Sequence, residues 1–290
     1  MWSLRLGQAM GLKELVVLPV AKKWIAGPDL ESAVKDAQGA NSRGIGVVVN
    51  FLGEDITDLA AMDAQVEEYL RLQQAMADNA VRGFVSVKLT QLGLGADEGG
   101  MKGRLERVIA NAERLSQLLW IDMEGSAFTG KTVAAYLEAH QKHPDTGVAI
   151  QAYARRSEAD VKAILDAGGR IRLVKGAYRE PQDFVFPTKD DIRMNFDRLM
   201  VSLFERGDAF AIATHDSVLI DRAKALSDSS HARFRFEFLK GIRDELKDEL
   251  VASGYEVVEY LPYGGSWWAY SKRRITEHPS NIWLLLRSVV

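Results

Sequence analysis

The chain has 290 residues, of which 47% are hydrophobic and 27% are charged, and its formal net charge is −3. This composition is that of a globular protein with one large domain, and the charge favours neither nucleic acid nor an anionic membrane as a partner. The sequence contains no cysteine, so disulfides and cysteine-ligated zinc sites are excluded.

Targeting and metal signals are weak. No apolar run approaches the roughly 18 residues of a membrane span, and the short run 15–21 lacks the features of a signal peptide. We therefore expect a cytoplasmic protein and leave open a peripheral contact with the inner face of the membrane. The five histidines form no HExxH-type metal pair.

Hydrophobic periodicity divides the chain into two parts. Residues 1–43 are expected to form an N-terminal helical cover whose short helices break at Gly27–Pro28 and at Gly39. From residue 44 onward, short apolar runs alternate with helix-periodic segments. The predicted strands are 44–51, 84–90, 118–124, 147–153, 171–178, 210–215, 233–238 and 257–262. The predicted helices are 56–80, 101–118, 131–143, 157–167, 188–206, 217–227 and 243–252, and an eighth begins at Ser266.

Eight strand–helix repeats over about 250 residues predict a (β/α)₈ barrel of the TIM type that occupies residues 44–290. A doubly wound open sheet is the alternative. The absence of a glycine-rich dinucleotide turn after the first strand makes this alternative less favourable.

Polar residues close most of the predicted strands, at the end of a barrel where active sites lie. They are Lys88, Asp122, Met123, Glu124, Gln151, Tyr153, Arg172, Lys175, Tyr178, Thr214, His215, Asp216, Glu237 and Tyr260. Taken singly, each has an ordinary structural explanation: His215 suits a core histidine, and Lys88 with Asp122 suits an ion pair between neighbouring strands. Taken together they indicate a ligand, because buried charges are costly unless they are paired or meet one.

A second cluster follows the last predicted strand. The chain breaks at Pro262 and Gly264–Gly265, and Ser266 is a good N-cap for the next helix. One face of that helix carries Trp267, Tyr270, Arg274 and Glu277, with Arg273 adjacent. Paired arginines suit a carboxylate ligand, whereas the alternative is a solvated helix end stabilised by i,i+4 pairs.

Motifs of other enzyme classes are largely absent from the sequence. The sequence shows no Ser-His-Asp order, P-loop or paired metal ligands. Either Lys88 or Lys175 at a strand end could form a Schiff base, as in barrel aldolases. A non-enzymatic barrel that binds an anionic metabolite is a third possibility.

The ordered motifs resemble those of the proline dehydrogenase family over roughly residues 44–288. The most specific motifs are RLVKGAY at 172–178 and YxxRRxxE at 270–277. VSVKLT around Lys88, WIDMEGS around Asp122, QAY from Gln151, ATH ending at His215 and FEF around Glu237 accompany them in the same order.

The resemblance implies an FAD enzyme that oxidises L-proline to Δ1-pyrroline-5-carboxylate by hydride transfer to flavin N5, the first step of proline catabolism to glutamate. It implies that Asp122 fixes a charged catalytic cluster and that Arg172 lies near flavin N5. The implied substrate-binding residues are Lys88, Tyr178, Tyr260, Arg273, Arg274 and Glu277. The implied FAD-binding residues are Met123, Gln151, Val174, Lys175, Gly176, Ala177, Thr214 and His215.

Further expectations concern the cofactor, the entrance and the partners. The FAD should be non-covalent, since no cysteine can form a thioether link. Glu54, after the first strand, is expected to meet Arg273 as a gate across the bound ligand. We expect a quinone as electron acceptor. Arg179 stands where long bifunctional members carry tryptophan, and the chain is expected to be a monofunctional member or an excised domain.

Overall fold

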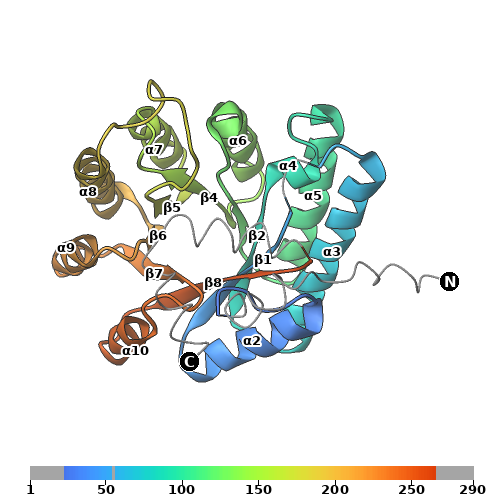
Figure 1. Ribbon diagram of the computed structural model, residues 1–290, viewed down its shortest axis with the longest axis horizontal. Coiled ribbons are helices and arrows are strands. Elements are labelled where there is room, and N and C mark those ends of the chain that lie inside the picture. The colour runs from blue at the N-terminus through green and yellow to red at the C-terminus, as the bar shows by residue number, and fades with distance from the viewer. Residues whose placement is uncertain (1–22, 54–55, 266–290) are drawn as a thin grey trace, which may run out of the picture.

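The computed structural model describes residues 23–53 and 56–265, in which eight parallel strands close into a barrel with helices around it (Figure 1). Each strand pairs with the next in sequence, and β8 closes the barrel against β1. The strands are β1 Gly46–Phe51, β2 Gly83–Val87, β3 Leu119–Ile121, β4 Thr146–Gln151, β5 Arg170–Val174, β6 Ala209–Ala213, β7 Arg233–Leu239 and β8 Val257–Tyr263. The helices are α2 Leu30–Ser42, α3 Leu59–Asp78, α4 Leu89–Leu92, α5 Glu98–Arg114, α6 Ser126–His140, α7 Ser157–Asp166, α8 Lys189–Arg206, α9 Ser217–Ser227 and α10 Asp244–Ala252. The predicted (β/α)₈ fold is confirmed.

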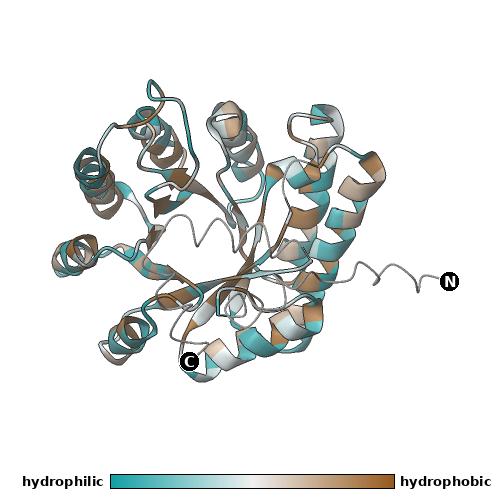
Figure 2. Cartoon of the chain, viewed as in Figure 1, coloured by the Kyte–Doolittle hydropathy of each residue, from teal (hydrophilic) through white to brown (hydrophobic). Residues whose placement is uncertain are grey.

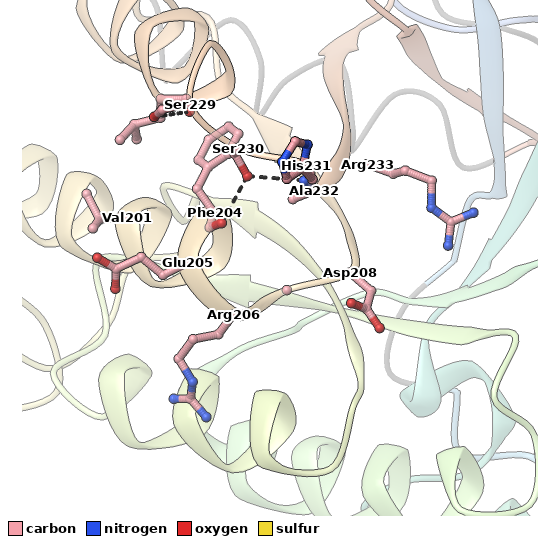
Figure 3. Close-up of a pocket in the computed structure, with 12 residues that line it drawn as sticks. Val201, Phe204, Glu205, Arg206, Asp208, Ser229, Ser230, His231, Ala232 and Arg233 are labelled. Atoms are coloured by element: carbon pink, nitrogen blue, oxygen red, sulfur yellow. Dashed lines mark hydrogen bonds between the residues drawn. The ribbon is translucent and has the colours of Figure 1, made fainter.

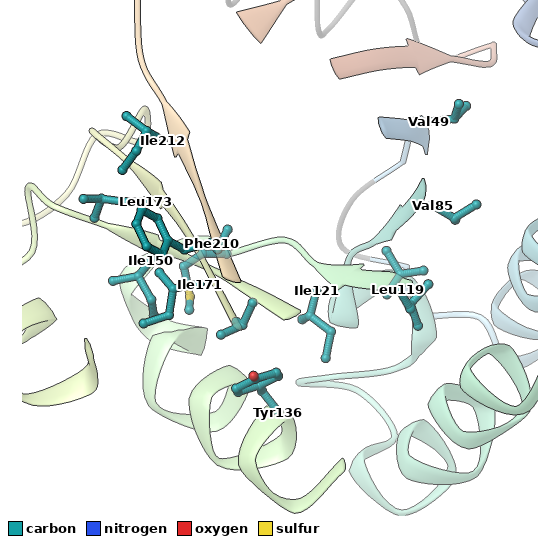
Figure 4. Close-up of a cluster of buried hydrophobic side chains, with 14 of the residues drawn as sticks. Val49, Val85, Leu119, Ile121, Tyr136, Ile150, Ile171, Leu173, Phe210 and Ile212 are labelled. Carbon is teal, nitrogen blue, oxygen red and sulfur yellow. The ribbon is translucent and has the colours of Figure 1, made fainter. Parts of the chain in front are cut away.

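The main hydrophobic core lies between the strands and the helices. Because successive strand residues face opposite sides, Val47 and Val49 join this core while Val48 faces the barrel interior. Figure 4 shows part of the core, where Tyr136 of α6 lies below outward-facing strand residues. The helices carry both hydrophobic and hydrophilic residues, as amphipathic helices do (Figure 2).

The barrel interior has a much smaller apolar cluster. Its buried members are Val48, Leu118, Trp120 and Val258. A Cβ on Gly147 would lie 2.3 Å from the Trp120 ring, so the indole occupies the space that a side chain on β4 would need. Many of the other inward-facing side chains of the barrel are polar or charged, which is unusual for a fold whose interior is commonly filled by Val, Ile and Leu.

Helix α2 packs against the seam of the barrel, beside β1 and β8. Its buried face is made of Ala33, Val34, Ala37 and Ala40. The predicted break at Gly39 is wrong, because the helix continues through this residue, around which a Cβ would meet nothing within 4 Å. A glycine on an open helix face costs only about 1 kcal/mol relative to alanine, and the packed alanine face outweighs it.

Five predicted strands end earlier than expected, namely the second to the sixth, and two of them illustrate the reason. The second predicted strand ran to residue 90, but β2 ends at Val87, and Lys88 is the N-cap of the short helix α4. The fifth predicted strand ran to residue 178, but β5 ends at Val174, just before Gly176 with φ +108°. The polar residues after these strands therefore lie on loops at the carboxyl end of the barrel.

Candidate active site

Asp122 follows β3 and is the centre of a buried hydrogen-bond network. Its Oδ1 accepts from Nη1 of Arg172 at 2.8 Å and from the hydroxyl of Ser86, and its Oδ2 accepts from the hydroxyl of Tyr260 at 2.6 Å. Nζ of Lys88 lies 3.8 Å from the same Oδ2. One carboxylate thus joins residues from β2, β3, β5 and β8, across the whole interior of the barrel.

Arg172 on β5 is held by a second carboxylate. Its Nε donates to Oε2 of Glu237 on β7 at 2.6 Å, and its guanidinium lies 4.6 Å from the centroid of the Trp120 ring. Burial opposes the charge on Arg172, but Glu237 and Asp122 outweigh burial and raise the pKa of Arg172 above its ordinary value. The guanidinium therefore stays charged and is fixed in one orientation.

Arg172 keeps one nitrogen without a partner. Among the described residues, its Nη2 is buried and has no hydrogen-bond partner. A buried donor left unpaired costs about 1–3 kcal/mol. The Oε1 atom of Gln151, at the end of β4, is also buried without a partner in the described part of the chain. The two groups belong to neighbouring strands, so one polar ligand bound between them would satisfy both.

Lys88 lies where β2 gives way to α4 and is 6% exposed, so its charge needs partners. Its Nζ donates to Oδ1 of Asn50 at 3.0 Å. The amide of Asn50 is itself oriented, because its Nδ2 donates to the carbonyl of Ser86 at 2.9 Å. An ammonium group has three donors, so Lys88 is able to bind a further acceptor.

The loop after β5 packs closely over the end of β4. A Cβ on Gly176 would lie 2.5 Å from the ring of Tyr153, so only glycine fits there. Burial and the nearby Glu180 raise the pKa of Tyr153 above its ordinary value. Glu180 also accepts from the backbone N–H of Ser126 at 2.8 Å, at the start of α6. These contacts give the loop a defined course.

Asp216 gathers cations beside that loop. Its Oδ2 accepts from Lys175 at 2.6 Å and from Arg193 of α8 at 2.9 Å. Burial would raise the pKa of Asp216, but the two cations outweigh it and lower this pKa to about 2. His215, the preceding residue, accepts at Nε2 from the backbone N–H of Leu239 at 3.1 Å.

A cavity of about 730 Å³ lies between the ends of α8 and α9 and the starts of β6 and β7, at the opposite end of the barrel (Figure 3). Asp208 and Arg233 line it, and so does Arg206, which pairs with Asp166 at 2.6 Å. None of the side-chain atoms that are buried without a partner in the described residues belongs to its lining. Size alone therefore does not make it the site of chemistry.

The described residues form neither a metal site nor a membrane-spanning helix. Residues 23–53 and 56–265 hold no group of three histidine or carboxylate side chains arranged to bind a metal ion. In the same residues, no helix has both the length and the apolar character that crossing a membrane requires.

The sequence model of the family described as "Proline dehydrogenase" matches residues 33–282. The chain belongs to the proline dehydrogenase family. Proline dehydrogenase 2 of Bacillus subtilis strain 168 is 33% identical over 265 residues, which cover 90% of this chain and 88% of that protein. Proline dehydrogenase of Deinococcus radiodurans is 34% identical over 270 residues, with 90% and 87% covered.

Solved structures show the same fold. Proline utilization A of Bdellovibrio bacteriovorus, inactivated by N-propargylglycine, matches with a TM-score of 0.84 at 23% identity over 89% of this chain. The match covers 32% of that protein, so the chain corresponds to about a third of its length. Proline utilization A of Bradyrhizobium japonicum matches with a TM-score of 0.75 at 20% identity. A likeness at this level of identity supports the barrel architecture of the family.

The structure brings part of the predicted proline dehydrogenase site together. Lys88, Asp122, Arg172 and Tyr260 form one network, directly or through Asp122. The predicted cofactor residues lie at the same end of the barrel, either in the last position of a strand or just after it: Met123, Gln151, Val174, Lys175, Gly176, Ala177, Thr214 and His215. Tyr178 is half-buried on the loop after β5. Glu54, Arg273, Arg274 and Glu277 lie outside the described residues.

Sequence reasoning missed the partners that orient these side chains. Ser86, Asn50 and Trp120 were given no role, and Glu237 was named as a strand end and as part of the FEF motif but was also given no role. One signal was available on β7, where Arg233, Arg235 and Glu237 alternate with aromatic residues in RFRFEFL. A period of two puts all three on the same face of a strand, which would have indicated a charged column inside the barrel.

Proposed function

We propose that this chain oxidises L-proline to Δ1-pyrroline-5-carboxylate with a non-covalently bound FAD as hydride acceptor, as the first step in the conversion of proline to glutamate. The observation that carries the proposal is the Asp122 network, in a member of the proline dehydrogenase family. This network holds two buried cations at the end of the barrel where ligands bind.

The residues at this end fit a flavin. Oε1 of Gln151 and Nη2 of Arg172 have no partner among the described residues, and the polar edge of an isoalloxazine ring would supply one to each. Gly176 lets the loop after β5 approach closely, and Lys175 places a cation beside it. The remaining contacts would come from Met123, Val174, Ala177, Thr214 and His215. No cysteine is present to form a thioether link to the flavin.

The chain's own residues would bind and orient the substrate. Lys88 offers ammonium donors, and we expect Arg273 and Arg274 to complete a clamp on the substrate carboxylate, with Glu277 orienting one arginine. Tyr260 and Tyr178 would border the pyrrolidine ring. Holding the carbon next to the ring nitrogen in a near-attack position is the main contribution that a protein makes to such a reaction. The bound flavin supplies the two-electron chemistry.

Proton transfer needs no dedicated base in this proposal. The carboxylates of Asp122 and Glu237 are each engaged by at least one arginine. Neither is therefore placed as a free base for the substrate amine. We infer that proline loses its amine proton before or during binding.

The Schiff-base aldolase alternative is less well supported. It requires a lysine that attacks as a neutral amine. Lys88 is bound to Asn50 and lies near Asp122, and Lys175 forms an ion pair with Asp216 at 2.6 Å. The amine nitrogens of both lysines are therefore already engaged by oxygen acceptors. A non-enzymatic metabolite-binding barrel does not account for the buried groups of Gln151 and Arg172, which lack partners among the described residues and fit a flavin.

Some parts of the proposal concern the surroundings of the site. We propose a quinone as electron acceptor, and a cytoplasmic protein that contacts the inner face of the membrane. We also propose that Glu54 pairs with Arg273 as a gate. An exposed ion pair is worth only about 0–1 kcal/mol, so Glu54→Ala should change turnover modestly. A loss as large as that of Arg274→Ala would contradict a gating role.

An absorption spectrum of the purified protein is the first test. Flavin bands that acid or heat releases into the supernatant would support non-covalent FAD, and colour that stays with the precipitated protein would contradict it. Borohydride trapping of a carbonyl substrate would favour the aldolase. Stabilisation by anionic metabolites without either signal would favour a binding protein.

The carboxylate clamp has its own test. Arg274→Met should raise the KM for proline by roughly ten- to a hundredfold, since one charge-assisted hydrogen bond is worth about 1.5–3 kcal/mol. Pyrrolidine lacks the carboxylate, so it should be a poor substrate for the unmodified protein and should be nearly unaffected by the substitution. Equal proportional losses with proline and pyrrolidine would show that Arg274 holds the fold or the flavin instead.

A further inference from the structure

Strand β7 carries a buried charge pair that the proposed reaction does not use. Glu237 lies between two guanidinium groups: its Oε2 accepts from Nε of Arg172 at 2.6 Å, and its Oε1 accepts from Nε of Arg235 at 2.9 Å. The side chain of Glu237 is only 2% exposed. Each carboxylate oxygen of Glu237 is therefore committed to a different arginine.

Arg235 pairs with Glu237 and also lies against two aromatic rings. Its guanidinium lies 4.5 Å from the ring centroid of Phe84 and 5.2 Å from that of Trp120. Among the described residues, its Nη2 is buried and has no hydrogen-bond partner. Contact with aromatic faces favours the cation, but an unsatisfied buried guanidinium nitrogen is costly.

The barrel makes room for these two arginines. Arg172 and Arg235 each pair in register with Ala211, and Arg172 also pairs with Ala149, so small residues flank them. Well-packed apolar residues in place of a buried ion cluster are often as stable or more stable. Packing therefore does not account for an arginine at position 235.

The charges around Arg172 indicate what Arg235 contributes. Lys88, Arg172 and Arg235 are cations, whereas Asp122 and Glu237 are carboxylates that pair with them. In this described group the carboxylates would balance Lys88 and Arg172, and Arg235 adds one positive charge. The negative charge of Glu237 is divided between Arg172 and Arg235. Arg235 therefore leaves less of that charge to neutralise Arg172. Interactions between charges are stronger in such an interior than in water.

We propose that Arg235 and Glu237 form a positioning pair that sets the effective charge of Arg172 and thereby the reduction potential of the flavin bound next to it. The inference rests on the proposed function, since it requires the flavin. Reduction adds negative charge to a flavin, and charge near the ring is one of the means by which a protein tunes it. Arg235 then favours the reduced flavin, and Glu237 opposes it.

Three variants test this assignment through the reduction potential of the bound flavin, measured by equilibration with a reference dye. Arg235→Met should lower the potential and Glu237→Gln should raise it, each by roughly a tenfold change in the reduction equilibrium, which is about 30 mV for a two-electron couple. The double variant restores the charge balance, so its potential should return to within about threefold of the original equilibrium. A loosened Arg172 would lower the potential in both single variants, and that result, or no shift, would overturn the proposal.

Matched controls separate charge from folding. Lys247 of α10 and Glu259 of β8 form another buried ion pair, with side chains 0% and 6% exposed. Lys247 is on a helix outside the barrel, so Lys247→Met and Glu259→Gln should leave the potential unchanged. Arg235→Lys keeps the charge and should stay near the original potential. Arg235→Gln replaces Arg235→Met if that variant does not fold, with the same expected decrease.

The outcome for the unmodified protein distinguishes the two proposals. Purified protein without flavin bands would contradict the proposed function and this inference with it. Normal flavin bands together with potentials that do not move in opposite directions would overturn the inference alone.

Discussion

Replacing Asp122 by alanine tests whether one carboxylate holds the interior of the barrel together. The substitution removes the acceptor of hydrogen bonds from Arg172 at 2.8 Å, Tyr260 at 2.6 Å and Ser86. Removing one partner of a buried ion pair costs about 3–5 kcal/mol. Arg172 keeps its bond to Glu237, so we expect a loss near the lower end, at about 3 kcal/mol.

Urea unfolding followed by circular dichroism measures this loss, provided that the denaturant slope stays unchanged. Asp122→Asn keeps the shape and one acceptor, and it should lose about 1.5–3 kcal/mol. Asp248→Ala is the exposed control, since its pair with Arg43 has side chains 55% and 41% exposed; it should lose about 0–1 kcal/mol. If Asp122→Ala loses no more than Asp248→Ala, the network does not stabilise the barrel. Under the proposed function, Asp122→Ala should also lose proline turnover while it still binds some FAD.

Three further predictions concern pH, backbone geometry and one hydroxyl. Burial lowers the pKa of His143, but Glu113 and Glu106 outweigh burial and raise this pKa above 6.5 in the folded protein. The stability that His143 contributes is therefore fully present below pH 6.5 and is lost as the pH rises through the pKa of the folded state. His143→Gln should therefore destabilise the protein more at about pH 5.5 than at about pH 9, and equal losses in urea would contradict this. Gly176→Ala should lower the free energy of unfolding by about 1–3 kcal/mol and weaken flavin binding, because φ is +108° and the new Cβ would meet Tyr153. The control is Gly168→Ala, where φ is +70° and the space is open, so it should lower the free energy of unfolding by only about 1–2 kcal/mol and leave flavin binding unchanged. Tyr260→Phe removes one donor to Asp122 and should lower the free energy of unfolding by about 1.5–3 kcal/mol, so an unchanged urea midpoint would refute the role of that hydroxyl.

The barrel could be predicted because each strand–helix repeat has its own local signal. The run GVVVNF on β1 is rich in valine and is buried, as propensity and hydrophobicity suggest. Strand ends were harder to predict, because they depend on turns. Helix α4 begins directly after Lys88 and ends at its C-cap Gly93 with φ +116°, and nothing in the apolar pattern of 84–90 indicates this turn. The predicted helix break at Gly39 was wrong because packing of the alanine face of α2 outweighed the low helix propensity of glycine.

The candidate site likewise has a part that could be predicted from the sequence and a part that could not. Lys88, Asp122 and Arg172 could be found by position, because barrels gather the carboxyl ends of their strands at one mouth. Their pairings could not, because Arg172 is 50 residues from Asp122 and 65 from Glu237 in the sequence. Which carboxylate a buried arginine contacts depends on the register of the closed sheet, and no local pattern encodes this.

The loose contact of Lys88 with Asp122 bears on whether the cluster is structural or functional. A pair that existed only to neutralise two charges on neighbouring strands would be close, yet the Lys88–Asp122 distance is 3.8 Å while Arg172 and Tyr260 bind Asp122 at 2.8 and 2.6 Å. Asp122 is thus already satisfied without Lys88, whose side chain donates to the neutral amide of Asn50. An ammonium group that is 6% exposed and lies 3.8 Å from its carboxylate partner in the described part of the chain is only weakly compensated for its burial. A bound carboxylate would relieve this cost, so Lys88 is better explained as part of a binding site than as part of the packing.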